Sequence, residues 1–101
     1  MKNFGEYIKH LRLKKGLNQT ELAAQVKLDS GGLSKVENGK KRLNLEKLVL
    51  LSKALNISEV EMKKQYLSDL FALRVIKYGV PNDVFNLAEE KTKYFKGRNI
   101  K

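Results

Sequence analysis

The stretch QTELAAQVKLDSGGLSKVENG, residues 19–39, is the most informative part of the sequence. In it, apolar residues recur at helical spacing in two short runs that are separated by about three residues. Two helices joined this closely cross steeply and need a small residue where they touch, which is the place of Ala23. The buried side of such a pair is supplied by Leu22, Val26, Leu28, Leu33 and Val36. We therefore predict two crossed helices, the second of which keeps one face exposed.

Residues suited to cap helices occur on both sides of this stretch and predict further helices. Three pairs have the spacing of a capping box, namely Asn3 with Glu6, Asn18 with Glu21 and Ser58 with Glu61. Two further helices can begin after Asp29 and Asn44. Gly39 offers a left-handed stop for the helix that follows Asp29. We therefore predict four short helices in the first half of the chain.

The second half of the chain predicts two more helices. One runs from Ser58 to Tyr78, where Gly79 and Pro81 end it. The other is an amphipathic segment over residues 83–95. Since no stretch of the chain alternates between apolar and polar residues with a period of two, the predicted fold class is all-α.

Charge gives the first indication of a partner. The 101 residues carry 21 Lys and Arg against 11 Asp and Glu, a formal net charge of +10. Residues 1–43 carry ten of the basic and four of the acidic side chains, so the positive excess is densest there. Such a surface attracts polyanions, nucleic acid first and anionic lipid second. The alternative is that the lysines serve only solubility.

Composition excludes several classes of protein. With no Cys, the chain has neither disulfides nor thiolate metal sites, and one His leaves little for a zinc or acid–base site. No nucleophile, phosphate-loop or metal-ligand motif occurs, so we expect no enzyme, no cofactor and no metal. The longest apolar run is about four residues against the roughly 20 of a membrane span, and the N-terminus has no apolar secretory segment. We expect a cytoplasmic protein without membrane contact.

Four pieces of sequence occur in the order and at the spacing of one known family. They are Leu-Arg at 11–12, GLNQTELA at 16–23, LSKVENG at 33–39 and LSKALNI at 51–57. Over residues 4–57 the chain resembles the lambda-repressor/Cro-like (XRE-type) helix-turn-helix family of bacterial and phage regulators. The resemblance implies an all-α, five-helix, lambda-repressor-like helix-turn-helix fold, and we place the DNA-binding domain at residues 1–57. Residues 58–101 then form a C-terminal helical extension.

The resemblance also implies which residues contact DNA. The base-reading positions of the recognition helix fall on Ser30, Gly31, Ser34 and Lys35. The phosphate contacts fall on Gln19, Asn38, Lys40, Lys41 and Arg42. Lys35 is the best candidate to bind guanine O6 and N7, with phosphate contact alone as its alternative. The alternative for Gln19 is that it is a solvated helix residue. The alternative for the basic run after Asn38 is that it is a solvated loop.

Two adjacent glycines in the recognition helix depart from the family pattern, which commonly has larger polar residues there. Gly31 and Gly32 each cost roughly 1 kcal/mol of helix propensity. Three interpretations stay open: the backbone approaches the groove unusually closely, thymine methyls and DNA shape are read in place of side-chain contacts, or the helix orders fully only on DNA. Away from the DNA, the resemblance implies an ion pair between Arg12 and Glu37, which would fix the recognition helix against the first helix.

The extension contains more apolar surface than one small core can absorb. We predict that a dimer interface uses Tyr66, Leu70, Phe71, Leu73, Ile76, Val84, Leu87 and Phe95, because the family binds two half-sites and the two-fold symmetry must be held. The alternative is that these side chains complete the core of a monomer. Residues 61–71 also resemble, loosely, the extension of regulators that accompany restriction-modification genes.

The function expected from these observations is that of a sequence-specific regulator of transcription. It would bind double-stranded DNA as a homodimer on a palindromic operator, as a repressor rather than an activator, with control of a restriction-modification system as a secondary suggestion. The alternative function is a DNA-binding antitoxin or protein-interaction module whose C-terminal helices bind a partner protein.

Overall fold

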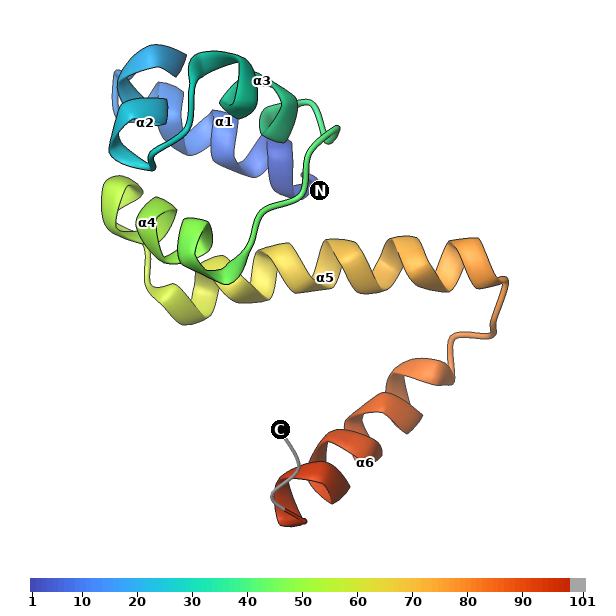
Figure 1. Cartoon of the computed structure of the whole chain (residues 1–101). Coiled ribbons are helices and arrows are strands. Elements are labelled where there is room, and N and C mark those ends of the chain that lie inside the picture. Colours follow the sequence, from blue (N-terminus) through green and yellow to red (C-terminus); the bar gives the residue numbers. More distant parts are fainter. Residues whose placement is uncertain (99–101) are drawn as a thin grey trace. The chain divides into compact units, whose positions relative to one another are not determined.

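The chain is all-helical, as predicted, in the part that the structure describes. The structure is a computed structural model that describes residues 1–98, and no strand occurs among them (Figure 1). Its six helices are α1 (Phe4–Lys14), α2 (Gln19–Gln25), α3 (Ser30–Glu37), α4 (Leu45–Leu55), α5 (Glu59–Tyr78) and α6 (Val84–Gly97). The last of them starts after Asp83 and extends beyond the predicted end at Phe95.

The helices begin where the capping residues are. Asn3 and Asn18 each form a complete capping box, in which the Asn side chain accepts from a backbone N–H and a Glu side chain accepts in return. The side chain of Asp29 caps α3, and that of Asn44 caps α4. Gly39 has a φ of +74°, so the left-handed stop predicted after α3 is present.

The chain divides into two compact units, Met1–Asp69 and Leu70–Lys101, of which the second is described as far as Arg98. The first unit therefore extends past the boundary that we predicted at residue 57 and includes the first half of α5. The physical reason is burial, because Met62 and Tyr66 on α5 pack into the core of this unit.

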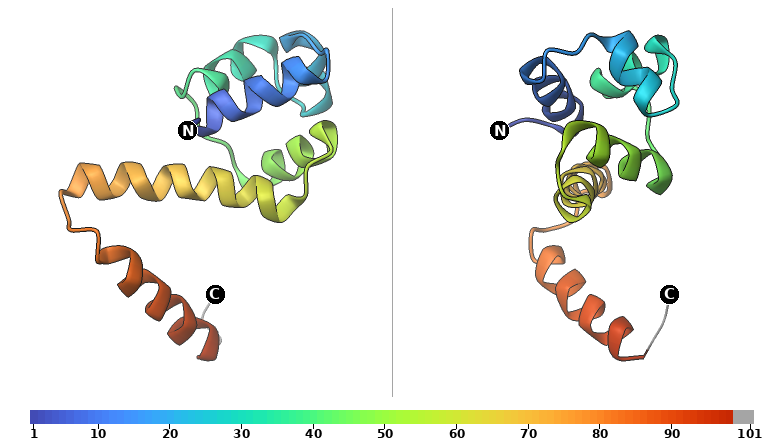
Figure 2. Two further views of the ribbon diagram at one scale, coloured as in Figure 1. Left: turned by 180° about the vertical axis from the view of Figure 1, so that it is seen from behind. Right: turned by 90° about the vertical axis from the view of Figure 1, so that its left-hand side faces the viewer.

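The core of the first unit lies between its five helical segments. Its most deeply buried side chains are Ile8, Leu22, Val26, Leu33, Leu51 and Met62. Helix α3 packs against both α1 and α2, and Ala23 is 1% exposed, in keeping with the small residue predicted at the crossing (Figure 2). At Gly5 a side chain would collide with the backbone carbonyls of Val36 and Glu37, so α1 and the end of α3 are in close contact there.

The second unit contains the end of α5 and the whole of α6. The rings of Phe71 and Phe85 pack edge to face, with centroids 4.9 Å apart. However, none of residues 70–98 is buried. Ile76 is 76% exposed and Leu73 is 59% exposed, so this unit leaves large apolar side chains in solvent.

Candidate nucleic-acid interface

Helix α3 has one buried and one open side. Gly32, Leu33, Val36 and Glu37 are buried on the side that faces the body of the first unit. Of the four residues predicted to read bases, Ser30, Gly31 and Lys35 are exposed and Ser34 is half-buried. The four thus lie on the side of α3 that the first unit leaves open.

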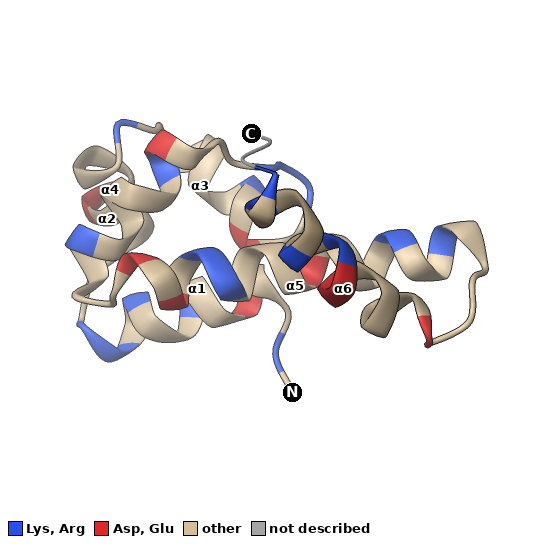
Figure 3. Cartoon of the chain, turned by 90° about the horizontal axis from the view of Figure 1, so that it is seen from below, with Lys and Arg blue, Asp and Glu red and all other residues tan. Residues whose placement is uncertain are grey.

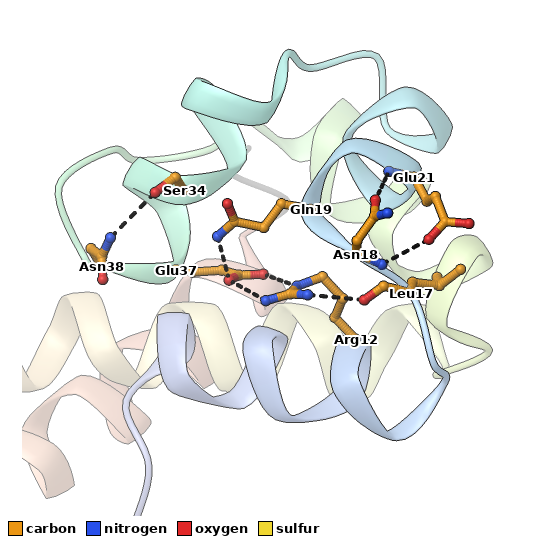
Figure 4. A network of polar contacts seen from close by, with 8 residues as sticks. All are labelled: Arg12, Leu17, Asn18, Gln19, Glu21, Ser34, Glu37 and Asn38. Carbon is orange, nitrogen blue, oxygen red and sulfur yellow. Dashed lines mark hydrogen bonds and ion pairs between the residues drawn. The ribbon is translucent and has the colours of Figure 1, made fainter.

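A buried ion pair fixes the end of α3 to α1 (Figure 4). The Nε of Arg12 donates to Oε2 of Glu37 at 2.7 Å, and Nη2 donates to Oε1 at 3.1 Å. The two side chains are 7% and 2% exposed, respectively. Arg12 also donates to the carbonyl of Leu17 at 2.9 Å, so it joins α1, the α1–α2 loop and α3. A bidentate pair of this kind holds α3 in one orientation.

Gln19 takes part in this network. Its Nε2 donates to Oε1 of Glu37 at 3.0 Å (Figure 4). Because an amide nitrogen carries two hydrogens, this bond uses only one of the two donors of the nitrogen. The bond to Glu37 therefore orients the side chain for which we predicted a phosphate contact, and sequence reasoning missed this bond.

The loop after α3 is fixed at both ends. At its start, the N–H of Lys40 donates to the carbonyl of Lys35 at 2.8 Å, and Asn38 donates to the hydroxyl of Ser34 at 3.4 Å. At its end, Leu43 is buried and both its backbone N–H and its carbonyl bond to the hydroxyl of Tyr66. Between these ends lie three exposed cations, Lys40, Lys41 and Arg42.

A hollow of about 420 Å³ lies between the start of α3 and this loop, lined by Asp29, Gly31, Gly32, Lys35, Lys40 and Lys41. The missing side chains of the two glycines help to open it. A Cβ on Gly32 would lie 2.9 Å from the carboxylate of Asp29 and 3.5 Å from the Nζ of Lys41. Because Gly31 and Gly32 have no side chains, the backbone of α3 is bare beside the three lysines that line the hollow, an arrangement that suits close approach to an anionic backbone.

Positive charge also occurs outside this region. Figure 3 shows Lys and Arg residues along much of the chain, in several helices and in the loops between them. Some of these cations hold the fold, since Lys15 donates to the carbonyl of Ala54 at 2.9 Å and Lys47 to that of Lys27 at 2.8 Å. Around the hollow, the charges are those of three exposed lysines and the single carboxylate of Asp29.

The eight residues predicted for a dimer interface do not share one environment. Tyr66 is 9% exposed, and its hydroxyl is bonded within its own chain, so we assign it to the core of the first unit. The other seven belong to the second unit. Leu73, Ile76, Leu87 and Phe95 are exposed, and Phe71 is exposed apart from its contact with Phe85. Leu70 and Val84 are half-buried.

A family model described as helix-turn-helix matches residues 8–62, which is more than half of the chain. The chain belongs to this helix-turn-helix family. The match confirms the family that the four pieces of sequence indicated, and it covers α2, α3 and the loop that follows them. No curated protein matches the chain in sequence.

Three solved structures show what proteins of similar fold do. The restriction-modification controller protein C.AhdI from Aeromonas hydrophila is 36% identical, with a TM-score of 0.55 over 58% of this chain and 89% of its own. The DNA-binding domain of the P22 C2 repressor is 32% identical, with a TM-score of 0.58 over 62% and 83%. A point mutant of the controller C.Esp1396I, bound to its operator site OM, is 29% identical, with a TM-score of 0.54 over 67% and 90%.

Together, the family and these relatives make the chain a DNA-binding transcriptional regulator. The match to the P22 repressor domain also agrees with the predicted lambda-repressor-like fold. Among residues 1–98, no helix combines the length and the apolar character that crossing a membrane requires.

Proposed function

We propose that the chain is a homodimeric repressor that recognises a palindromic operator in double-stranded DNA. The observation that carries this proposal is the placement of α3, whose inner side is held by the pair of Arg12 and Glu37 and whose outer side is open. A helix presented in this way fits the major groove, which is wide enough to admit it.

Within one subunit, the contacts divide by chemistry. Lys35 is proposed to donate to guanine O6 and N7, while the hydroxyls of Ser30 and Ser34 bind base edges beside it. At Gly31 the bare backbone lets the helix approach the bases closely, which we favour over the two other interpretations because the hollow is open in the structure. Sequence is read on this side of α3.

Phosphates are proposed to bind around α3. The cations Lys40, Lys41 and Arg42 would contact the sugar–phosphate backbone along the loop, with Asn38 and Gln19 as neutral donors. If each subunit neutralises about four phosphates, the logarithm of the binding constant falls with the logarithm of salt concentration with a slope of about −7 for the dimer. These contacts supply affinity and fix the register of α3 on the duplex.

The second unit is proposed to hold the dimer. It leaves Leu73, Ile76, Leu87 and Phe95 exposed, and contact with a second copy of the chain would remove their apolar surface from water. Two copies of α3, held by two-fold symmetry, would enter successive major grooves about one helical turn apart. Because two of the compared relatives are restriction-modification controllers, we propose such a system as the regulated target.

In-vitro selection of bound duplexes from a random pool, combined with sedimentation of the complex, tests this function. We expect a palindromic consensus that is occupied by two chains. Lys35→Ala should then cost about 1–3 kcal/mol of binding and relax the preference at one base pair, whereas Lys41→Ala should weaken binding to all duplexes alike. A pool that yields no enriched sequence would contradict the proposal.

The exposed apolar side chains of the second unit also favour a second candidate, an antitoxin or interaction module in which they bind a different protein. The two candidates differ in solution. Recovery of the chain with a stoichiometric partner protein, and sedimentation of the free chain as a monomer, would favour the second.

A further inference from the structure

Tyr66 forms an unusual pair of hydrogen bonds with one residue of the basic loop. Its hydroxyl accepts from the backbone N–H of Leu43 at 3.0 Å and donates to the carbonyl of the same residue at 2.9 Å. The two residues are 23 positions apart in sequence, and both are buried. The hydroxyl of Tyr66 thus satisfies both polar groups of a buried stretch of backbone that no regular element serves.

The two bonds to Tyr66 fix the end of the loop, directly beside its cations. Leu43 directly follows Arg42, and the other end of the three-residue basic run is fixed by the bond between Lys40 N–H and the carbonyl of Lys35. With both ends held, the backbone of Lys40, Lys41 and Arg42 has few conformations to lose when the side chains bind phosphate.

We propose that Tyr66 is a positioning residue for DNA binding, which acts through the basic loop and touches no DNA itself. The inference rests on the proposed role of residues 40–42 in phosphate binding and adds the element that presents them. It also assigns a role to the first half of α5, because the loop that follows the recognition helix is anchored on α5.

The ring and the hydroxyl of Tyr66 have different roles. The ring packs edge to face against Phe4, with centroids 5.0 Å apart, and belongs to the core. Tyr66→Phe keeps this packing and removes only the two bonds to Leu43. The matched control is Tyr7→Phe, because Tyr7 also lies next to Phe4, with ring centroids 6.4 Å apart, but comes from α1.

The test measures binding of the full chain to its selected duplex and to a scrambled duplex, well below the unfolding temperature. There, a loss of stability alone leaves the affinity unchanged. We expect Tyr66→Phe to weaken binding to both duplexes by a similar factor of about three- to tenfold, and to make the salt slope shallower by about one. Tyr7→Phe should change neither quantity.

A mutant cycle shows whether the effect passes through the loop. In a background with Lys40→Ala, Lys41→Ala and Arg42→Ala, the factor caused by Tyr66→Phe should shrink towards one. Amide hydrogen exchange of the free protein gives a readout without DNA, in which Tyr66→Phe should accelerate exchange at Leu43 relative to the amides inside α1.

Three results would overturn the inference: unchanged affinity in Tyr66→Phe, the same loss of affinity in the triple-alanine background, or unchanged exchange at Leu43. Failure of the proposed function would look different, because the unmutated chain would then bind neither duplex or would bind both with equal affinity. The exchange measurement still decides whether Tyr66 holds the loop in that case.

Discussion

The two units of this chain use apolar residues in opposite ways. In the first unit, Ile8, Leu22 and Leu51 are fully enclosed, and every helix of the helix-turn-helix region begins at a residue that caps it. In the second unit, none of the residues described is buried, although the unit contains large side chains such as Phe71, Ile76 and Phe95.

The two units also differ in the source of their stability. The first unit has a core and a buried ion pair of its own, whereas within residues 70–98 the two helices share one aromatic contact, between Phe71 and Phe85. Isolated helices are marginal in water, because most helical stability comes from packing an apolar face. We therefore expect the first unit to resist denaturation by itself and the second to depend on a partner chain.

The largest effect is expected at the buried ion pair. Glu37→Gln leaves the guanidinium of Arg12 buried without a countercharge and should cost about 3–5 kcal/mol of the unfolding free energy of the first unit. Urea denaturation followed by circular dichroism measures it. The control in the second unit is Glu89→Gln, which breaks an exposed pair with Lys93 at 3.4 Å and should have no measurable effect. Equal losses in both variants would contradict the comparison.

The dimer should depend on the second unit alone. Leu73→Glu combined with Ile76→Glu places charges in the proposed interface and should weaken dimerisation about a hundredfold, or about 3 kcal/mol. Sedimentation over a range of concentrations measures the change. Leu13→Glu is the matched control, because Leu13 is 58% exposed on α1 in the first unit and should leave dimerisation unchanged. If the double variant remained dimeric with unaltered affinity, the interface would lie elsewhere.

A smaller effect is expected where α1 touches α3. Gly5→Ala drives a methyl group into the carbonyls of Val36 and Glu37, so α3 must shift, at a cost of about 1–3 kcal/mol. Gly97→Ala, in the second unit, meets no atom within 4 Å and should be neutral or slightly stabilising. Thermal unfolding of the two variants provides the test, and a neutral Gly5→Ala would show that the contact is looser than described.

The smallest effect is expected at Gly31, where one substitution should change stability and DNA binding in opposite directions. Gly31→Ala meets nothing closer than the Asp29 carboxylate at 3.7 Å, so it should stabilise the unit by about 0.5–1 kcal/mol. The same methyl group would narrow the hollow beside α3 and should weaken binding to the selected duplex. Gly32→Ala should gain less stability, because its methyl group would press on the Asp29 cap at 2.9 Å. A Gly31→Ala variant that binds DNA as well as before would exclude close backbone approach.

Local signals in the sequence were sufficient to predict the helices of the first unit. The side chains of Asn3, Asn18, Asp29 and Asn44 form their caps within three residues, so neighbouring positions determine these helix starts. The spacing of apolar residues likewise predicted which face of α3 is buried.

Contacts between distant residues could not be predicted in this way. The sequence shows that Tyr66 has a large apolar ring, and on that ground we predicted a place for it in the dimer interface. The sequence does not show that its hydroxyl bonds to Leu43, 23 positions away. Similarly, nothing local indicates that the carboxylate of Asp69 accepts from the N–H of Phe4 at 2.7 Å, and so ties α5 to the start of α1. One signal could have placed Tyr66 in the core: it lies four residues after Met62, on the same face of a helix. A buried tyrosine hydroxyl in turn needs a hydrogen-bond partner.

The central claim is that the open side of α3 and the loop after it bind a palindromic duplex in a dimer. Equilibrium titration of the selected duplex over a series of salt concentrations, with the protein-to-DNA ratio determined at saturation, tests this most directly. We expect two chains per duplex, a salt slope of about −7 and a much weaker affinity for a scrambled duplex. Equal affinity for both duplexes, or a slope near zero, would contradict it.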